Sequence, residues 1–260
     1  MTLLVDVLAR SPLPVVRAIV SGVPAGASWS LHGVSGRDEW LVASGTSSGA
    51  EVVTADPWAP VGPAVSYLLR YGAVVETAGP VVRPYEGRSA VTDLTGRVVA
   101  DVLLMKGGGD QRDSERRAHF SEVRGARFSP ARLDPVAGAG GGSLTVRAAN
   151  PDAAVLEGLL ASNRPLVVLH NEQRCQARDC VIAPARTVYV TSDSNDVTSR
   201  SDRGEREWSL SYRLMPSGVV GGTVPVVDLA DVKAAFATLA DLKAAVPTLG
   251  ALVRGDWLIG

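Results

Sequence analysis

Short runs of alternating hydrophobic and polar residues, separated by glycine and proline, dominate the first third of the chain. Alternating runs occupy residues 28–32, 39–42, 64–69 and 74–77, and apolar runs occupy residues 15–20 and 52–54. Strands that recur every ~8–12 residues with turn residues between them are typical of a β-sandwich. We therefore expect residues 1–84 to form an N-terminal β-sandwich, with Pro80 and Pro84 marking its boundary.

A second set of strand patterns follows, and we assign it to one domain, residues 85–217. The predicted strands are residues 90–94, 97–104, 143–147, 166–170, 187–191 and 207–214, and residues 175–182 are expected to return antiparallel. Thr95-Gly96 predicts a hairpin turn between the first two strands. In the last strand Trp208, Leu210, Tyr212 and Leu214 share one face. This pattern favours a second β-sandwich or a split barrel.

One helix is expected inside the second domain. Asn150-Pro151-Asp152 combines an N-cap residue, a proline at the first helical position and an acid in the first turn. An apolar stripe at helical spacing follows, made of Val155, Leu156, Leu159 and Leu160. The helix should end near Asn163, before Pro165.

Two polar segments interrupt the strands. Residues 106–142 are dense in Gly, Arg, Asp, Glu and Ser, and residues 192–206 are rich in Ser, Asp and Arg. We expect the first to be a long loop with limited structure of its own and the second to be an exposed loop. Long loops in compact domains are usually functional or disordered.

The last 40 residues contain a repeat of about ten residues. Leu229–Thr238 reads LADVKAAFAT, Leu239–Thr248 reads LADLKAAVPT, and a decayed third copy starts at Leu249. Asp228 and Thr238 are expected to be N-caps, with Asp231 and Asp241 three residues later, and Pro247 should end the second helix. Helices below ~12 residues are marginal alone. Residues 218–260 should therefore form a short helical arm that needs a surface to lie on.

Composition excludes several classes of function. The formal net charge is −1, so no global field attracts nucleic acid or an anionic membrane. No apolar run is long enough to span a bilayer, and the first 20 residues lack the pattern of a cleaved secretory signal. The hydrophobic content of 46% fits a folded chain.

His170, Cys175 and Cys180 have the spacing His-x4-Cys-x4-Cys. Three ligand types so close in sequence could indicate zinc, but structural zinc usually has four ligands and tighter Cys spacing. His32 and His119 are remote in sequence. We therefore predict no metal site, and expect buried thiols in a strand pair, with a local disulfide as the alternative.

Two glycine motifs are weak candidates for chemistry. Gly45-Thr-Ser-Ser-Gly49 matches the nucleophile elbow, in which Ser47 would be the nucleophile, but a strand rather than a helix is expected to follow it. Gly107-Gly108-Gly109 follows a strand, as in a phosphate loop, but Lys106 precedes the glycines instead of following them. A flexible hinge is the better interpretation of the Gly107–Gly109 cluster. We predict no catalytic and no cofactor-binding residue.

Clusters of arginine and tryptophan give further candidates for binding. Acidic residues interleave with the arginines at 112, 116, 117, 124, 127 and 132, which indicates a salt-bridged face rather than a nucleic-acid site. The tryptophans at 29, 40 and 208 lie in alternating strands and are expected in the core. Trp58 and Trp257 are less constrained, and Trp58 with Tyr71 or Tyr85 could form a glycan platform.

The chain resembles minor tail proteins of long-tailed actinobacteriophages (siphoviruses), in particular distal tail proteins. The resemblance rests on LADVKAAFATLADLKAAVPTLGAL with GDWL at 255–258, on the block from Ser143 to Leu169 that includes RPLVV, and on REWSLSYRLM at 206–215. The N-terminal module, with DPWAP at 56–60, is similar to the fibronectin type III-like or immunoglobulin-like insertions of phage tails. The repeat departs from the aromatic-rich form of the family at Leu239 and Leu249.

The resemblance implies a structural virion protein and no enzyme. Distal tail proteins form a ring, usually a homohexamer, that joins the tail tube to the tail tip or baseplate hub. The expected partners are therefore the chain itself, the tail tube protein and hub or other minor tail proteins, with no cofactor, no nucleic acid and no membrane. Location would be the virion, after assembly in the bacterial cytoplasm. The alternatives are a glycan-binding adhesin of the tail tip and, less favoured, a hydrolase that uses Ser47 or a carboxylate pair.

Overall fold

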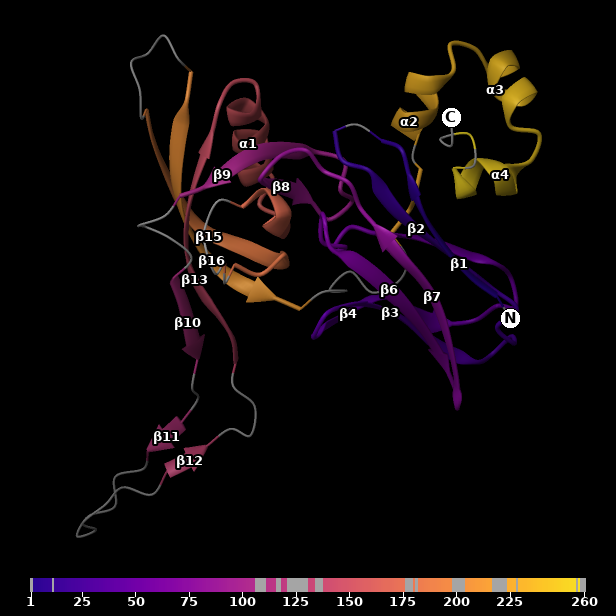
Figure 1. Cartoon of the computed structure of the whole chain (residues 1–260), viewed down its shortest axis with the longest axis horizontal. Coiled ribbons are helices and arrows are strands. Elements are labelled where there is room, and N and C mark those ends of the chain that lie inside the picture. Colours follow the sequence, from indigo (N-terminus) through magenta and orange to yellow (C-terminus); the bar gives the residue numbers. More distant parts are fainter. Residues whose placement is uncertain are drawn as a thin grey trace.

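The computed structural model shows a mainly β protein with a sandwich, a barrel and a helical arm (Figure 1). It describes residues 2–10, 12–105, 111–115, 118–120, 131–133, 138–175, 180, 182–197, 204–216, 224–227, 229–255 and 257. The mainly β fold class with a short helical C-terminal arm, expected from the strand and repeat patterns, is confirmed.

Two antiparallel sheets form the predicted fibronectin type III-like sandwich. One has the order β1 (Thr2–Leu8), β2 (Val15–Ser21), β5 (Val52–Asp56). The other has the order β4 (Asp38–Thr46), β3 (Ser28–Ser35), β6 (Ala64–Tyr71), β7 (Val74–Val82). Strand β1 is not predicted by alternation, because its apolar residues run together, but it pairs with β2 from Thr2↔Ser21 to Leu8↔Val15.

The sandwich core follows from alternation on the facing strands. Trp29 and Leu31 of β3 and Tyr67 and Leu69 of β6 are buried, while the residues between them are less so. They pack with the apolar residues Val16, Ala18 and Val20 of β2. Successive side chains of a strand point to opposite faces, so this pattern turns one face of each sheet inward.

The second domain is a split barrel. The strands β9 (Val99–Leu104), β13 (Gly138–Ala148), β16 (Arg206–Met215), β15 (Ala185–Val197), β14 (Leu166–His170) and β8 (Ser89–Asp93) follow one another, and β8 pairs again with β9. The closure between β9 and β13 is short, with the pairs Leu104↔Val146 and Leu103↔Arg147. Of the two architectures expected for this domain, the structure has the split barrel.

Helix α1 (Asp152–Ala161) packs against β8, β9 and β13. Leu156 and Leu159 of the predicted stripe are buried in the barrel core beside Trp208 and Leu210, and Val155 and Leu160 pack at its edge. The expected N-cap at Asn150 is wrong: Pro151 is the cap residue and makes no side-chain cap. The Asn150 amide instead lies against Gly204.

Both polar segments contain more pairing than expected. Within residues 106–142, β10 (Gln111–Glu115) pairs with β13, and β11 (Ala118–Phe120) pairs with β12 (Ala131–Leu133). Within residues 192–206, β15 continues to pair with β16 as far as Val197↔Arg206. Backbone hydrogen bonds hold these ribbons without a buried apolar face on β15 beyond residue 190, so hydrophobic periodicity did not predict them.

The sandwich and the barrel share a third hydrophobic cluster. Leu8, Leu13, Trp58 and Val61 come from the sandwich side, and Ala90, Val99, Val167 and Leu169 come from the barrel. Val224 and Val226, which belong to the predicted arm but precede its first helix, complete the cluster. Val224 also accepts a hydrogen bond from the backbone N–H of Ala55, at 2.8 Å, beside the edge strand β5. The two domains are therefore joined by a continuous core.

The C-terminal arm consists of α2 (Leu229–Ala235), α3 (Leu239–Ala245) and α4 (Leu249–Arg254). The predicted cap at Thr238 is confirmed as a reciprocal capping box with Asp241, whereas Asp228 lies outside the described residues. The arm rests on its own chain, through the ion pairs Arg97–Asp231 at 2.7 Å and Arg254–Glu51 at 3.2 Å. In the described part of the chain, no helix has both the length and the apolar character needed to cross a membrane.

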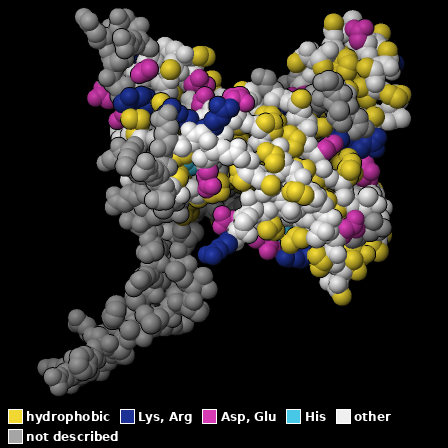
Figure 2. Space-filling model, viewed as in Figure 1, with side chains coloured by type: hydrophobic (Ala, Val, Ile, Leu, Met, Phe, Trp, Pro, Cys, Tyr) yellow, Lys and Arg dark blue, Asp and Glu magenta, His cyan; other side chains and the backbone are white. Residues whose placement is uncertain are grey.

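The first leucine of each arm helix faces solvent. Leu229, Leu239 and Leu249 are 67%, 66% and 75% exposed. Hydrophobic side chains are spread over the outer surface of the arm in the space-filling view (Figure 2, upper right). The repeat thus places one exposed leucine every ten residues along the arm.

Candidate functional site

A histidine and two cysteines meet where the barrel joins the sandwich. His170 is the last residue of β14, and the next residue, Asn171, caps the short 3-10 helix η1 (Glu172–Arg174) by accepting a hydrogen bond from the backbone N–H of Gln173 at 3.1 Å. Cys175 follows this turn directly. The Asx cap thereby reverses the chain and brings Cys175 back beside His170.

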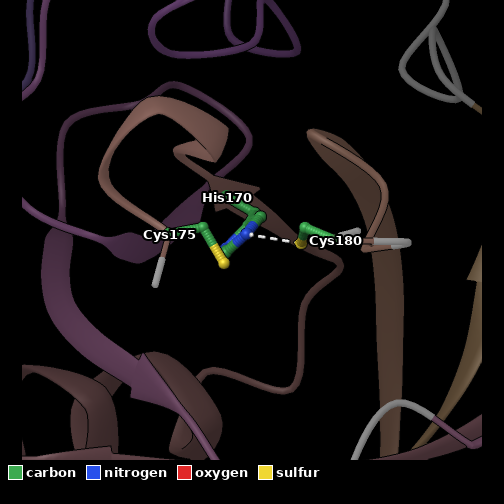
Figure 3. Close-up of side chains that lie close together, drawn as sticks. All are labelled: His170, Cys175 and Cys180. Carbon is green, nitrogen blue, oxygen red and sulfur yellow. Dashed lines mark hydrogen bonds between the residues drawn. The ribbon is translucent and has the colours of Figure 1, made fainter. Parts of the chain in front are cut away.

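The ligand atoms of His170, Cys175 and Cys180 all lie within 4.8 Å of one another. His170 Nε2 is 3.2 Å from Cys180 Sγ, and Figure 3 shows both cysteine side chains directed at the imidazole. His170 Nδ1 is 2.9 Å from the Ser89 hydroxyl on the neighbouring strand β8. His170 is 3% exposed, whereas both cysteines are half-buried.

The environment perturbs two of these groups. Burial lowers the pKa of His170, an effect that nearby Arg186 reinforces and that Glu172 opposes. Burial also raises the pKa of the Cys180 thiol, and the neighbouring Cys175 adds to this rise. The imidazole is therefore neutral at neutral pH, and Cys180 is a protonated thiol unless a cation stabilises its thiolate.

The cysteines differ from the sequence expectation. The expected strand pair is wrong for the described residues, because Cys175 ends the η1 turn and Cys180 lies outside any strand. The two are not disulfide-bonded. The spacing His-x4-Cys-x4-Cys thus brings three ligand atoms together, which makes this cluster a candidate for cation binding.

The turn that carries Cys175 is fastened to both domains. The Asn171 side-chain amide donates to Tyr85 O at 2.9 Å and to Gly87 O at 3.3 Å, in the segment between the domains. The Gln173 side-chain amide donates to Gly62 O, in the sandwich, at 2.9 Å. Anything that stabilises this turn therefore also stabilises the junction.

A buried polar network lies next to the same junction. Asp56 accepts hydrogen bonds from Tyr67 Oη at 2.9 Å, Trp40 Nε1 at 3.0 Å and the backbone N–H of Trp58 at 3.0 Å. Arg83, 1% exposed, donates to the carbonyl oxygens of Pro14, Pro57 and Ala59. Burial lowers the Arg83 pKa to about 10, so the guanidinium is charged at neutral pH and helps to balance Asp56.

A cleft of ≈ 520 Å³, lined in part by residues 84–87 between the two domains, brings two carboxylates together. Asp101 and Asp152 line it with Arg10 and Tyr85, and the backbone N–H of Asp101 donates to Asp152 Oδ1 at 3.0 Å. Burial raises the Asp101 pKa, the Tyr85 hydroxyl bonded to it lowers it, and the charge of Asp152 raises it further. Sequence reasoning could not select this pair, because the two residues meet through folding of α1 against β9.

The other residues singled out by sequence have structural contacts. Ser47 Oγ donates to Val23 O at 2.9 Å and accepts from Gly49 N at 3.0 Å, and the strand β5 follows, so the geometry of a nucleophile elbow is not formed. Trp58 is 3% exposed in the junction core, which removes it from a glycan platform. Trp257 packs edge-on against Phe236, with ring centroids 5.2 Å apart.

The glycine-rich and arginine-rich candidates fall mostly outside the described residues. Lys106 and Gly107–Gly109 lie outside the described residues, as does His119's side chain. The backbones of Arg112 and Arg132 lie in β10 and β12, but the side chains of the six arginines between 112 and 132 are also outside the described set. The tryptophans at 29 and 208 are buried in the two domain cores, and Trp40 packs between the sandwich and junction cores, as expected.

Comparison of the chain with protein-family models, with curated proteins and with solved structures gives no match.

Proposed function

We propose that the protein is a structural subunit of a phage tail: a distal tail protein that forms a ring, as a homohexamer, between the tail tube and the tail tip. The proposal rests on the resemblance of the sequence to siphovirus minor tail proteins and on one observation in particular. The barrel extends a ribbon, β10 with β13 and then β11 with β12, away from both domains (Figure 1).

The ribbon supports a role in assembly because of its energetics. The β11–β12 pair joins no further described strand, and a two-stranded hairpin is marginally stable in water on its own. A neighbouring subunit can supply the missing surface, either by packing on the ribbon or by adding its own strand to the edge of β10. In a closed ring each subunit gives its ribbon to one neighbour and receives the ribbon of another.

The arm offers a second contact surface. The exposed leucines at 229, 239 and 249 would each contribute roughly 1.5–3 kcal/mol if a partner buried them completely. The sequence predicts that the whole arm needs a partner, but the structure shows that its base belongs to the junction of its own chain. A deletion of residues 221–260 would therefore damage the fold as well as any assembly contact.

The decisive experiment shortens the ribbon. Replacing residues 116–137 by Asn-Gly would join Glu115 to Gly138, which are already paired, through a tight turn. We expect an unchanged thermal unfolding midpoint and a change of mass in solution, measured by light scattering, from a ring to a monomer. The control is Val75→Ser, on the exposed face of β7, which should leave the ring intact.

A second variant tests the arm separately. The triple change of Leu229, Leu239 and Leu249 to Ser should keep the fold and weaken incorporation into tail particles. If the unmodified chain stays monomeric at high concentration and is missing from tail particles, the proposed function is wrong. If the shortened ribbon still forms rings, the ribbon is not the ring contact.

A further inference from the structure

We propose that His170, Cys175 and Cys180 form a binding site for a zinc-type divalent cation, with one His nitrogen and two Cys sulfurs as ligands and a fourth position open to water. This inference does not depend on the proposed role in a phage tail. It rests on the geometry of the cluster and on the way in which the surrounding residues hold the imidazole.

The donor set and spacing fit the cation. Tetrahedral coordination with Zn–S near ~2.3 Å and Zn–N near ~2.0 Å places the ligand atoms about 3.5–3.8 Å from one another. The three ligand atoms here already lie within 4.8 Å, and His170 Nε2 is 3.2 Å from Cys180 Sγ. Small side-chain rotations of the two cysteines would therefore complete the site, without a change of the β14 backbone.

The second nitrogen of the imidazole has a hydrogen-bond partner, as it usually does in metal-bound histidines. Ser89 Oγ lies 2.9 Å from His170 Nδ1, and Ser89 and His170 are opposite each other in the β8–β14 register. In the tautomer in which Nδ1–H donates its hydrogen bond to the Ser89 hydroxyl oxygen, Nε2 has a lone pair available on the side of the cysteines. Ser89 is thus a positioning residue rather than a ligand.

The surroundings allow a cation to enter and to bridge two elements of the fold. The histidine is buried, whereas the two cysteines are accessible enough for a cation to enter. Each thiol would lose its proton to solvent as its sulfur binds, so that two thiolates neutralise the divalent charge. The bound cation would link the end of β14 to the η1 turn, which is itself fastened to the sandwich through Gln173 and Gly62.

The test is titration of the reduced, metal-free full-length protein with Co²⁺, followed by competition with Zn²⁺. We expect one Co²⁺ per chain, with thiolate-to-cobalt charge-transfer absorption that Zn²⁺ abolishes. Cys175→Ser and Cys180→Ser should each weaken binding at least 100-fold. Ser89→Ala should weaken it roughly 10–100-fold, and His32→Gln, a histidine on the remote strand β3, should leave it unchanged.

A measurement on the unmodified chain covers the case in which a variant fails to fold. Stoichiometric Zn²⁺ should slow the reaction of both thiols with a thiol reagent and raise the thermal unfolding midpoint by several degrees. The proposal is overturned if the reduced protein shows no thiolate–cobalt absorption. It is equally overturned if either Cys→Ser variant binds Co²⁺ as tightly as the unmodified chain, or if Zn²⁺ leaves thiol reactivity unchanged.

Discussion

The junction between the sandwich and the barrel and the parts that project from them use their residues in opposite ways. At the junction, Arg83 is 1% exposed and donates to three backbone carbonyls, and apolar residues from both domains and the chain before the arm form one cluster. On the arm, three leucines are 66–75% exposed. The charged and apolar groups of the junction thus have partners within the chain, whereas the leucines of the arm present apolar surface to solvent.

The largest effect should come from breaking the junction. Arg83→Met removes the positive charge that helps to balance the Asp56 carboxylate and removes a donor from three backbone carbonyls. We expect a loss of about 3–5 kcal/mol in the free energy of unfolding, measured by urea denaturation. The matched control is Arg70→Met, which removes an exposed pair with Glu39 and should cost below about 1 kcal/mol. Equal losses in the free energy of unfolding for the two variants would contradict the expected difference between a buried and an exposed arginine.

A pair of leucines gives the next comparison. Leu156, on α1, is fully buried in the barrel core, whereas Leu239, on α3, is 66% exposed. Leu156→Ala should cost about 2–5 kcal/mol because it leaves a cavity. Leu239→Ala should change stability by no more than ~0.5 kcal/mol. If Leu239→Ala destabilises the isolated chain as much as Leu156→Ala does, the arm is part of the body.

A smaller effect is expected at the cap of α3. Thr238→Ala removes the hydroxyl that accepts the Asp241 N–H bond, at 3.1 Å, and breaks the capping box. The local cost should be about 1 kcal/mol. Hydrogen exchange should accelerate at the α3 amides while the amides of β3 stay as protected as before. Acceleration throughout the chain would show that the arm unfolds together with the body.

The smallest effect concerns the pH dependence of Asp101. Burial raises its pKa in the folded chain, so the folded state holds this proton more tightly than the unfolded state does. Its contribution to stability is therefore present below the unfolded carboxyl pKa of about 3.9 and is lost as the pH rises through the folded pKa. Asp101→Asn should be relatively more stable at pH ~7 than at pH ~3.5, by a degree or two in the unfolding midpoint. An identical difference at both pH values would contradict this.

The strands that bury an alternating face could be predicted from the sequence. Trp208, Leu210 and Tyr212 line the barrel core, and Thr238 and Asp241 form the predicted capping box. The ribbons at β10–β12 and at the end of β15 could not be predicted, because they lack a periodic buried face. Nor could barrel closure, since the β9–β13 contact joins segments that are distant in sequence and pairs few residues.

The spacing of His170, Cys175 and Cys180 could be recognised in the sequence, but it did not predict that their ligand atoms lie close together. The side chain of Asn171 caps η1 and redirects Cys175, so among the described residues the cysteines do not form the expected strand pair. Ser89 carried no signal at all, because its position opposite His170 depends on the pairing of β8 with β14. The sequence shows which chemical groups are present, but the register of the sheet determines which of them lie next to each other.

The return of Val224 to the edge of β5 has a consequence for dissecting this molecule. The N-terminal sandwich has the outline of a transferable module, yet a fragment ending at residue 84 would uncover that strand edge together with the apolar side chains that Val224 and Val226 now cover. An unpaired strand edge beside an exposed apolar surface promotes aggregation. Fragments made for fusions or crystallisation should therefore include the chain as far as residue 227. The residues that complete the sandwich lie more than 130 positions after β7, its last strand.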